Sequence, residues 1–223
     1  MNQNSNPTPV SFTPALGQRW LTPAYDTAIA ALTREGRWRR LLVDQIAPAP
    51  ADRILDVGCG TGTLTIRLAR AASKAAIFGL DPDAEVLERA RRKVSAAGVS
   101  VRFVQGFLTE ETLAVVAPLT KITSSLVLHQ VPLGEKKRML GLMRTALRDG
   151  GELHLADYGL QRTRLSRWLF RHTVQSLDGI EDTQPNADGI LPTLMKDAGF
   201  ARVEEQSCIG TPTGSISIYR CVA

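Results

Sequence analysis

The chain has 223 residues, a length that suits one α/β domain and is too short for two ordinary domains with a linker. Hydrophobic residues make up 43% of it and charged residues 22%, a globular composition that excludes a disordered or membrane-spanning chain. The formal charge is +5, but the basic residues fall mainly on expected helices, where a solvated face explains them better than a nucleic-acid site.

The first residues and the cysteines indicate the cellular location of the protein. Residues 1–10 show neither the basic start nor the apolar run of a secretory signal. The cysteines are odd in number, widely spaced and without histidines at metal-ligand spacing: Cys59, Cys208 and Cys221. We therefore expect a cytoplasmic protein with reduced thiols and no metal site.

Two helix-like pieces, residues 23–33 and 36–46, precede the first expected strand. Their surroundings are too apolar for a linker because they include Trp20, Tyr25 and Trp38. We expect residues 1–50 to form a tail and a helical lid over the carboxyl edge of the sheet, and residues 51–223 to form a single globular unit. A helix pair that only stabilises the core is the alternative.

Strand-like and helix-like segments alternate through the rest of the chain. Short β-rich apolar runs recur at 53–57, 76–80, 99–104, 121–124, 152–156, 202–207 and 216–222. Helix-like stretches separate the first five runs, at 63–72, 83–97, 110–116 and 134–147. Such alternation predicts βαβ units and a doubly wound parallel sheet covered on both faces. Only the turn residues 210–214 separate the last two runs, which predicts an antiparallel hairpin at the end.

Glycines gather directly after the first expected strand, in the run DVGCGTG at residues 56–62. Glycine lets the backbone turn sharply and approach a ligand, and a loop between strand and helix is the nucleotide position of doubly wound folds. Asp81 closes the next strand, where a carboxylate suits ribose hydroxyls. The G-x-G-x-G spacing differs from the G-x-G-x-x-G of dinucleotide sites, and Asp56 suits a positively charged sulfonium group better than a pyrophosphate.

These residues resemble those of the class I S-adenosylmethionine-dependent methyltransferases, of the methyltransferase-11/25 type related to ubiquinone and menaquinone C-methyltransferases. Residues 56–62 are similar to the family's first motif, Asp81 to its ribose-binding acid, and residues 124–131 and 147–153 to its motifs around the fourth and fifth strands. The resemblance extends from about residue 37 to the C-terminus. It implies a seven-stranded Rossmann-like α/β fold and S-adenosylmethionine as cofactor, with S-adenosylhomocysteine as product.

The resemblance also implies which residues contact the cofactor. They are Asp56, Gly58, Cys59, Gly60, Gly62, Leu64, Asp81, Pro82, Gly106, Phe107 and Ser124. Phe107 departs from the family pattern, in which an acid accepts the adenine amino group; an aromatic ring would stack on adenine instead, with Gln105 or Thr109 as hydrogen-bonding candidates. A second departure, Leu119-Thr120 in place of Phe-Asp, indicates only a changed loop.

Methyl transfer is an in-line displacement that depends on placing the acceptor atom, and an acidic acceptor also needs a base. His129 follows the fourth strand where the acceptor would meet the methyl group, so it is the candidate base; a histidine that only shapes the pocket is the alternative. Asp157 and Tyr158 are candidate substrate contacts after the fifth strand, although Asp157 could equally cap the next helix. Tyr25 and Trp168 complete the candidate substrate residues.

Residues 161–176 carry arginines among apolar residues, where the resembled family varies its substrate cover. A basic amphipathic helix of this kind is typical of a solvated cover, and contact with a membrane surface or an anionic substrate is the alternative. The acidic stretch 178–182 would border the substrate opening or pair with these arginines.

The prediction is an enzyme that methylates a small, apolar or aromatic metabolite, although the residues name neither the acceptor atom nor the oligomeric state. An NAD-dependent oxidoreductase is disfavoured by the glycine spacing. A nucleic-acid methyltransferase is disfavoured because residues 123–126 lack the Asn/Asp-Pro-Pro-aromatic motif of that group. A non-catalytic S-adenosylmethionine-binding protein is favoured only by Phe107.

Overall fold

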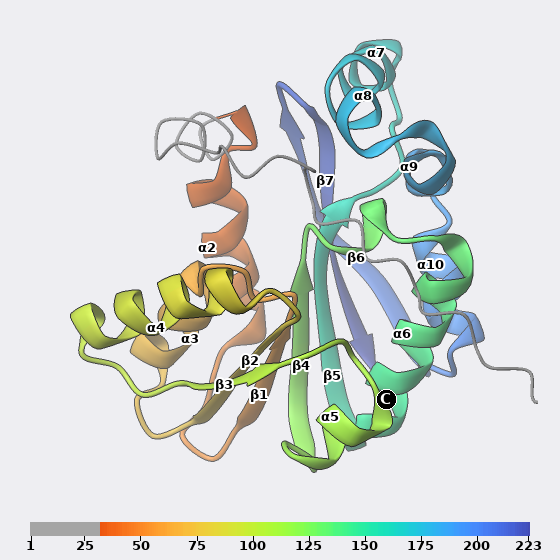
Figure 1. The fold of residues 1–223 in the computed structure, drawn as a ribbon. Helices are drawn as coiled ribbons and strands as arrows, with labels where there is room; N and C mark the ends of the chain where they lie inside the picture. The colour runs from red at the N-terminus through yellow and green to blue at the C-terminus, as the bar shows by residue number, and fades with distance from the viewer. Residues whose placement is uncertain (1–31) are drawn as a thin grey trace, which may run out of the picture.

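The computed structural model describes residues 32–223, which form a seven-stranded sheet with helices on both faces (Figure 1). The strand order is β3-β2-β1-β4-β5-β7-β6. The strands are β1 Arg53–Val57, β2 Ala76–Asp81, β3 Arg102–Gln105, β4 Leu119–Ser125, β5 Leu147–Tyr158, β6 Arg202–Thr211 and β7 Gly214–Val222. β1 to β5 pair in parallel, whereas β7 is antiparallel to both its neighbours, β5 and β6. The expected α/β class and the antiparallel end of the sheet are confirmed.

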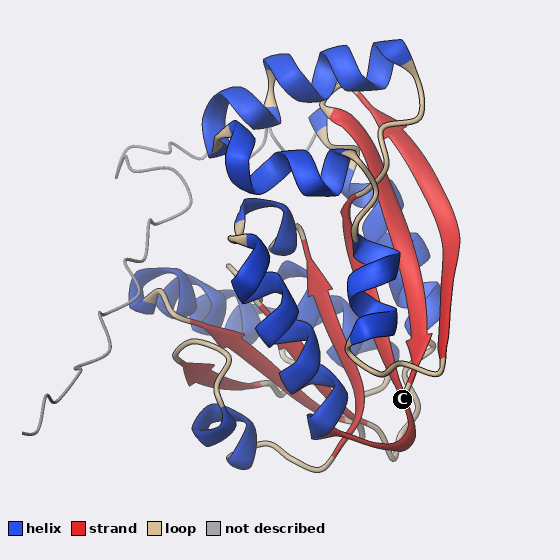
Figure 2. Ribbon diagram, turned by 90° about the vertical axis from the view of Figure 1, so that its right-hand side faces the viewer, coloured by secondary structure: helices blue, strands red, loops and turns tan. Residues whose placement is uncertain are grey.

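The helices form two layers and a cover beyond the upper edge of the sheet in Figures 1 and 2. α2 Glu35–Ile46, α3 Thr63–Ala71 and α4 Ala84–Ala97 lie on one side. On the other side lie α5 Glu110–Ala114, α6 Leu133–Ala146 and α10 Leu191–Asp197. A short 3-10 helix, η1 Leu128–Gln130, follows β4. The cover consists of α7 Arg164–His172, α8 Val174–Asp178 and α9 Ile180–Ala187.

Local sequence signals explain how α4 begins and ends. Asp83 caps its first turn, because the carboxylate accepts hydrogen bonds from the backbone N–H groups of Glu85 and Val86. Leu87, Ala90 and Val94 are buried at helical spacing, and Gly98 ends the helix with φ 63°.

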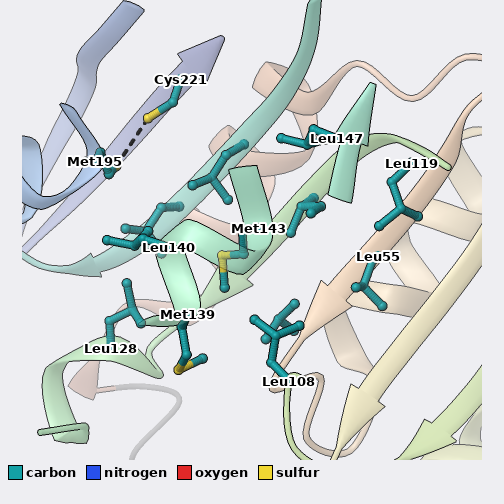
Figure 3. Close-up of a cluster of buried hydrophobic side chains, with 14 of the residues drawn as sticks. Leu55, Leu108, Leu119, Leu128, Met139, Leu140, Met143, Leu147, Met195 and Cys221 are labelled. Atoms are coloured by element: carbon teal, nitrogen blue, oxygen red, sulfur yellow. Dashed lines mark hydrogen bonds between the residues drawn. The ribbon is translucent and has the colours of Figure 1, made fainter. Parts of the chain in front are cut away.

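Each face of the sheet packs its own hydrophobic cluster. In the cluster on the α6 side, Met139, Leu140 and Met143 lie with Leu55 and Leu119 of the strands (Figure 3). The other cluster includes side chains of α2, α3 and the β6–β7 hairpin: Trp38, Leu42, Leu64, Leu68, Ile209 and Ile216. Each fully buried leucine contributes about 2 kcal/mol to folding through its transfer from water. Because successive residues of a strand point to opposite faces, Asp56 projects toward the α2–α3 layer and Leu55 toward the α6 layer.

Several strands are longer than the sequence predicts. β6 extends to Thr211 and β7 begins at Gly214, so only two residues form the turn between them. β5 begins at Leu147, five residues before the expected run at 152–156. Polar residues and glycines make up most of these extensions, and the strand pairing continues beyond the apolar runs.

The region before β1 is only partly described. α2 packs against α3, β5 and β7, and the Gln45 side chain donates a hydrogen bond to the carbonyl of Tyr219. α2 therefore belongs to the layer over one face of the sheet, as the alternative to a lid expects. Residues 23–31 of the other helix-like piece, including Tyr25, lie outside the described residues. From residue 32 onward, no helix combines the length and apolarity needed to span a membrane.

Candidate active site

The glycine loop after β1 adopts a backbone that favours glycine. Gly58, Gly60 and Gly62 have φ values of 69°, 53° and 75°. The N–H groups of Gly58 and Cys59 donate to the carbonyl of Leu80, at 2.8 and 3.0 Å, which ties the loop to the end of β2.

Neighbouring side chains leave no room for a methyl group at Gly58 and would crowd one at Gly62. A Cβ at Gly58 would lie 2.3 Å from Cγ2 of Val127, and one at Gly62 would lie 3.2 Å from Cβ of Ala90. No described atom lies within 4 Å of a Cβ at Gly60. The loop is thus packed against protein at its ends and open at its centre, where a ligand can approach the backbone.

Asp81 lies at the carboxyl end of β2 and faces this open part of the loop. Its Oδ2 accepts a hydrogen bond from the Gly60 N–H at 2.9 Å, and its Oδ1 accepts one from the Asp83 N–H at 3.0 Å. Burial raises the pKa of Asp81, and the two hydrogen bonds oppose that shift. Each carboxylate oxygen can accept a further hydrogen bond, so the residue fits the predicted contact with ribose hydroxyls.

Asp56 at the end of β1 has a buried and incompletely paired carboxylate. Its Oδ2 accepts a hydrogen bond from the Thr65 hydroxyl at 2.9 Å, whereas Oδ1 has no hydrogen-bond partner among residues 32–223. Burial raises the pKa of Asp56 to about 7. A buried unpaired oxygen carries a desolvation cost that a cationic group beside it would offset. The carboxylate therefore fits the positively charged part of S-adenosylmethionine.

The loop after β3 lies beside Asp81. Gln105 pairs with Asp81 in the sheet, and the Gly106 N–H donates to the Asp81 carbonyl at 3.1 Å. Phe107 follows with 47% of its surface exposed, and its carbonyl accepts a hydrogen bond from the Thr112 hydroxyl at 2.9 Å. An accessible aromatic ring next to the candidate ribose site is consistent with the predicted stacking on adenine.

Three other predicted cofactor residues direct their side chains into the protein. Leu64 is buried in the α2–α3 cluster. The Ser124 hydroxyl donates to the carbonyl of Val57 at 2.8 Å and links β4 to β1. Burial raises the pKa of the Cys59 thiol, which keeps it protonated. These side chains position the loop, and only their backbones remain candidates for cofactor contact.

A buried acid–histidine pair lies at the carboxyl ends of β4 and β5. Leu126, with φ 54°, turns the chain into η1, and His129 follows at 6% exposure. Its Nδ1 lies 2.8 Å from Oδ1 of Asp157, and its Nε2 lies 3.4 Å from Oδ2 of Asp178, at the end of α8. The ring also meets that of Tyr158 edge-on, with centroids 5.1 Å apart.

The two carboxylates decide the charge of His129. Burial alone would lower its pKa, but the charges and hydrogen bonds of Asp157 and Asp178 outweigh burial and raise the pKa to about 9. The histidine is therefore an imidazolium at neutral pH while the cover lies in this position. In this arrangement the Asp178 carboxylate lies 3.4 Å from Nε2 and occupies the side of the ring that an acceptor would need.

Asp157 is the centre of a hydrogen-bond network. Its Oδ2 accepts from the N–H groups of Val127, Leu128 and His129, at 3.2, 2.7 and 3.3 Å. Asp157 thus caps the N-terminus of η1, an element that comes before it in the sequence. The alternative that Asp157 caps the next helix is wrong, because the Thr163 hydroxyl caps α7.

Further contacts join the cover to the core near this pair. The Lys136 ammonium of α6 donates to the carbonyl of Asp182, and the Asn186 side chain donates to the carbonyl of Tyr158 at 2.9 Å. The Tyr158 hydroxyl and the Thr213 hydroxyl are 2.7 Å apart, which holds the tyrosine ring in place. The cover is thus held over the β4–β5 edge by polar contacts.

The structure separates the substrate candidate Trp168 from this network. Trp168 is 57% exposed on α7 and stacks on His172, with ring centroids 4.6 Å apart. Arg162 and Arg167 pair with Glu205 and Asp188, so these arginines do not pair with the acidic stretch 178–182.

Sequence reasoning missed Asp178 as a partner of His129, and it missed Lys136, because neither shows a motif and both reach the site from distant elements. It also assigned no role to Thr120 and Lys121. The Thr120 hydroxyl donates to Oδ1 of Asp52 at 2.8 Å, and the Lys121 ammonium contacts Oδ2 of Asp52 at 2.8 Å and the carbonyl of Ile46 at 2.8 Å. The expectation of a changed loop is wrong, because Leu119, Thr120 and Lys121 begin β4, and from there Thr120 and Lys121 anchor the end of α2.

Comparison with known proteins agrees with this geometry. Residues 54–151 match the family model described as a methyltransferase domain. An uncharacterized methyltransferase from Synechocystis sp. is 28% identical over 194 residues, which cover 85% of this chain and 84% of that protein. A ubiquinone/menaquinone biosynthesis C-methyltransferase from Geotalea daltonii is 28% identical over 154 residues, which cover 67% of this chain and 65% of that protein.

A solved structure gives the same result for the fold. The magnesium protoporphyrin IX methyltransferase from Synechocystis with bound S-adenosylhomocysteine has a TM-score of 0.63 and 19% identity, and the match covers 92% of this chain and 90% of that one. Other matched methyltransferase structures are longer, and the chain spans only 58 or 59% of their length. Taken with the glycine loop and the two acids, these matches identify the chain as a class I S-adenosylmethionine-dependent methyltransferase.

Proposed function

We propose that this enzyme methylates a small, apolar or aromatic ring compound and that His129 removes a proton from it. The observation that carries the proposal is the position of the His129–Asp157 pair. Val127 packs on Gly58 of the glycine loop, and His129 follows only two residues later. The candidate base therefore lies beside the candidate cofactor site, at the edge where an acceptor would meet the methyl group.

The residues around the pair support an apolar acceptor. Tyr158 meets His129 edge-on, and the rings of Tyr158 and Phe170 have centroids 5.2 Å apart. Two of the similar proteins are named for quinone and porphyrin methylation, and both names refer to ring compounds. We therefore place a ring compound with an acidic O–H or C–H group first among the acceptors.

Each group has one role in this proposal. S-adenosylmethionine supplies an electrophilic methyl group on a sulfonium. Asp81 and the Gly60 backbone would hold the ribose, Asp56 would lie near the positive charge, and Phe107 would pack on adenine. Asp157 fixes Nδ1 of His129. Withdrawal of Asp178 lets the imidazolium release its Nε2 proton to solvent, and the neutral Nε2 then accepts the proton of the acceptor.

Transfer of a labelled methyl group tests the proposal. The purified protein is incubated with methyl-labelled S-adenosylmethionine and, separately, with a quinol, a phenol, an aliphatic acid and an amine. We expect label in the quinol or the phenol. His129→Gln should lower the rate about a hundredfold or more while S-adenosylhomocysteine still binds, and His172→Gln, on the exposed side of α7, should change neither.

Two outcomes would contradict the proposal. Label found only in the aliphatic acid or the amine would exclude a ring compound as the acceptor. An unchanged rate for His129→Gln would leave the histidine with the pocket-shaping role that is the alternative.

A further inference from the structure

Exposed large apolar side chains are concentrated on the cover. Eight large apolar side chains are exposed among residues 32–223, and half of them lie between residues 165 and 180: Leu165, Trp168, Leu177 and Ile180. Leu165 and Trp168 are 66% and 57% exposed, one helical turn apart on α7. A solvated cover does not require a tryptophan and a leucine side by side in water.

α7 presents three different stripes along its length. Ser166 and Phe170 are buried, and Phe170 packs against the start of β7 at Gly214. At 100° per residue, Leu165 and Trp168 lie on the side opposite to this buried stripe. Arginines occupy the flank between them, at positions 164, 167 and 171. Figure 1 shows α7 at the upper end of the molecule. Because the buried stripe packs on β7, the apolar stripe on the opposite side of the helix faces solvent.

The charge of α7 itself is positive. It contains no acidic residue, and within the described chain Arg164 and Arg171 form no ion pair, whereas Arg167 pairs with Asp188 at 3.3 Å. The acidic residues of the cover lie on α8 and α9, where Asp178 is engaged with His129 and Glu181 and Asp182 occupy the first turn of α9.

A groove lies beside the arginine flank of α7. It has a volume of about 230 Å³ and is lined by Arg167, Phe170, Arg171, Gln175, Gln184 and Ala187. The Gln175 amide donates to Gln184, and Gln184 and Arg167 contact Asp188, so the Arg171 guanidinium is the donor of this groove that suits a phosphate oxygen. The apolar stripe and this groove together match a phospholipid, which offers acyl chains beside an anionic headgroup.

We propose that α7 docks the protein on a membrane surface rich in anionic phospholipid. Leu165 and Trp168 enter the boundary between headgroups and acyl chains, and Arg164 and Arg171 contact the phosphates. A second copy of the chain fits this surface less well. A two-fold contact through α7 would bring the arginines of both copies together.

Docking would also affect how the acceptor reaches the active site, and this part of the inference rests on the proposed function. Asp178 connects the same cover to His129. A membrane-bound α7 would therefore place the acceptor side of the enzyme next to lipid, where an apolar ring compound is dissolved.

Vesicle sedimentation tests the docking. The full chain is mixed with vesicles of phosphatidylcholine alone or of phosphatidylcholine with phosphatidylglycerol. We expect binding to the anionic vesicles only, and its loss at about 0.5 M salt because screening is then severe. Arg164→Gln with Arg171→Gln should weaken binding roughly thirtyfold, and Leu165→Ser with Trp168→Ser should weaken it at least tenfold.

Matched controls separate docking from folding and from catalysis. Arg91→Gln with Arg92→Gln removes two exposed arginines from α4 and should leave vesicle binding unchanged. All variants should bind S-adenosylhomocysteine like the wild type, a measurement that reports on the cofactor site independently of the membrane.

Four outcomes would overturn the proposal. The first is failure of the wild type to bind anionic vesicles at low salt, and the second is equal binding to neutral vesicles. The third is binding of inorganic phosphate without binding of vesicles, which would assign the groove to a soluble anion. The fourth is loss of self-association in Leu165→Ser with Trp168→Ser without any vesicle binding, which would assign the stripe to a second copy.

Discussion

Single glycines in the loop after β1 serve two different purposes. At Gly58 a methyl group would collide with Val127 at 2.3 Å, whereas at Gly60 it would meet no described atom within 4 Å. We predict that Gly58→Ala lowers the free energy of unfolding by about 2–4 kcal/mol, from overpacking and from a left-handed backbone. Gly60→Ala should cost only about 1–2 kcal/mol but should weaken S-adenosylhomocysteine binding more than tenfold.

Urea unfolding and calorimetric titration check this pair. Gly58→Ala combined with Val127→Ala should recover part of the lost stability. Equal losses of stability for the two single variants would mean that packing at Val127 does not distinguish the glycines.

Asp178 controls the proton on His129. Its charge and hydrogen bond contribute to the raised pKa of about 9. In Asp178→Asn that contribution disappears, so the pKa of His129 falls and the neutral base exists at lower pH. We expect the acid limb of the kcat profile for methyl transfer to move to lower pH, with Glu181→Gln as the neighbouring control. Superimposable profiles for wild type and Asp178→Asn would exclude this role.

The sequence predicted the residues whose roles depend on local spacing. Asp56 and Asp81 belong to runs of glycine and strand residues, so their positions could be read directly. Asp178 and Lys136 could not, because α8 and α6 bring them to His129 and Asp157 only in the folded chain.

Among the elements, α2 depends on a contact from β4. The Lys121 ammonium donates to the carbonyls of Ile46 and Ala47 at the end of α2 and pairs with Asp52 at 2.8 Å. The pair is largely buried, so its loss leaves a carboxylate unpaired. We predict that Lys121→Met lowers the free energy of unfolding by about 3 kcal/mol in urea. Exposed Lys137→Met is the control, and equal stability of the two variants would refute the anchoring role.

Apolar periodicity predicted the order and type of the elements better than their ends. It located β1 correctly at Arg53–Val57, but it ended β6 at residue 207 although the strand continues to Thr211. The final residues of that strand are held by pairing with β7, which a pattern within one segment does not contain.

At the scale of the whole molecule, His129 connects β4, β5 and the cover. Its pKa is about 9 in the folded protein and about 6.5 in an unfolded chain. The folded state therefore binds the proton more tightly, and this stabilisation is complete below pH 6.5 and is lost as pH rises through about 9. We expect the free energy of unfolding to fall by a few kcal/mol over that range, and His129→Gln to remove most of the slope. A wild-type slope that survives in His129→Gln would contradict this.

Calorimetric titration with S-adenosylhomocysteine is the most direct test of the assigned cofactor site. The wild type should bind it and should not bind NADH. Asp81→Asn should weaken binding at least tenfold, since the amide loses hydrogen-bond acceptors for ribose and turns a donor toward the Gly60 N–H. Asp83→Asn, which alters only the cap of α4, should bind like the wild type. Wild-type affinity in a folded Asp81→Asn variant, or binding of NADH in place of S-adenosylhomocysteine, would contradict the account.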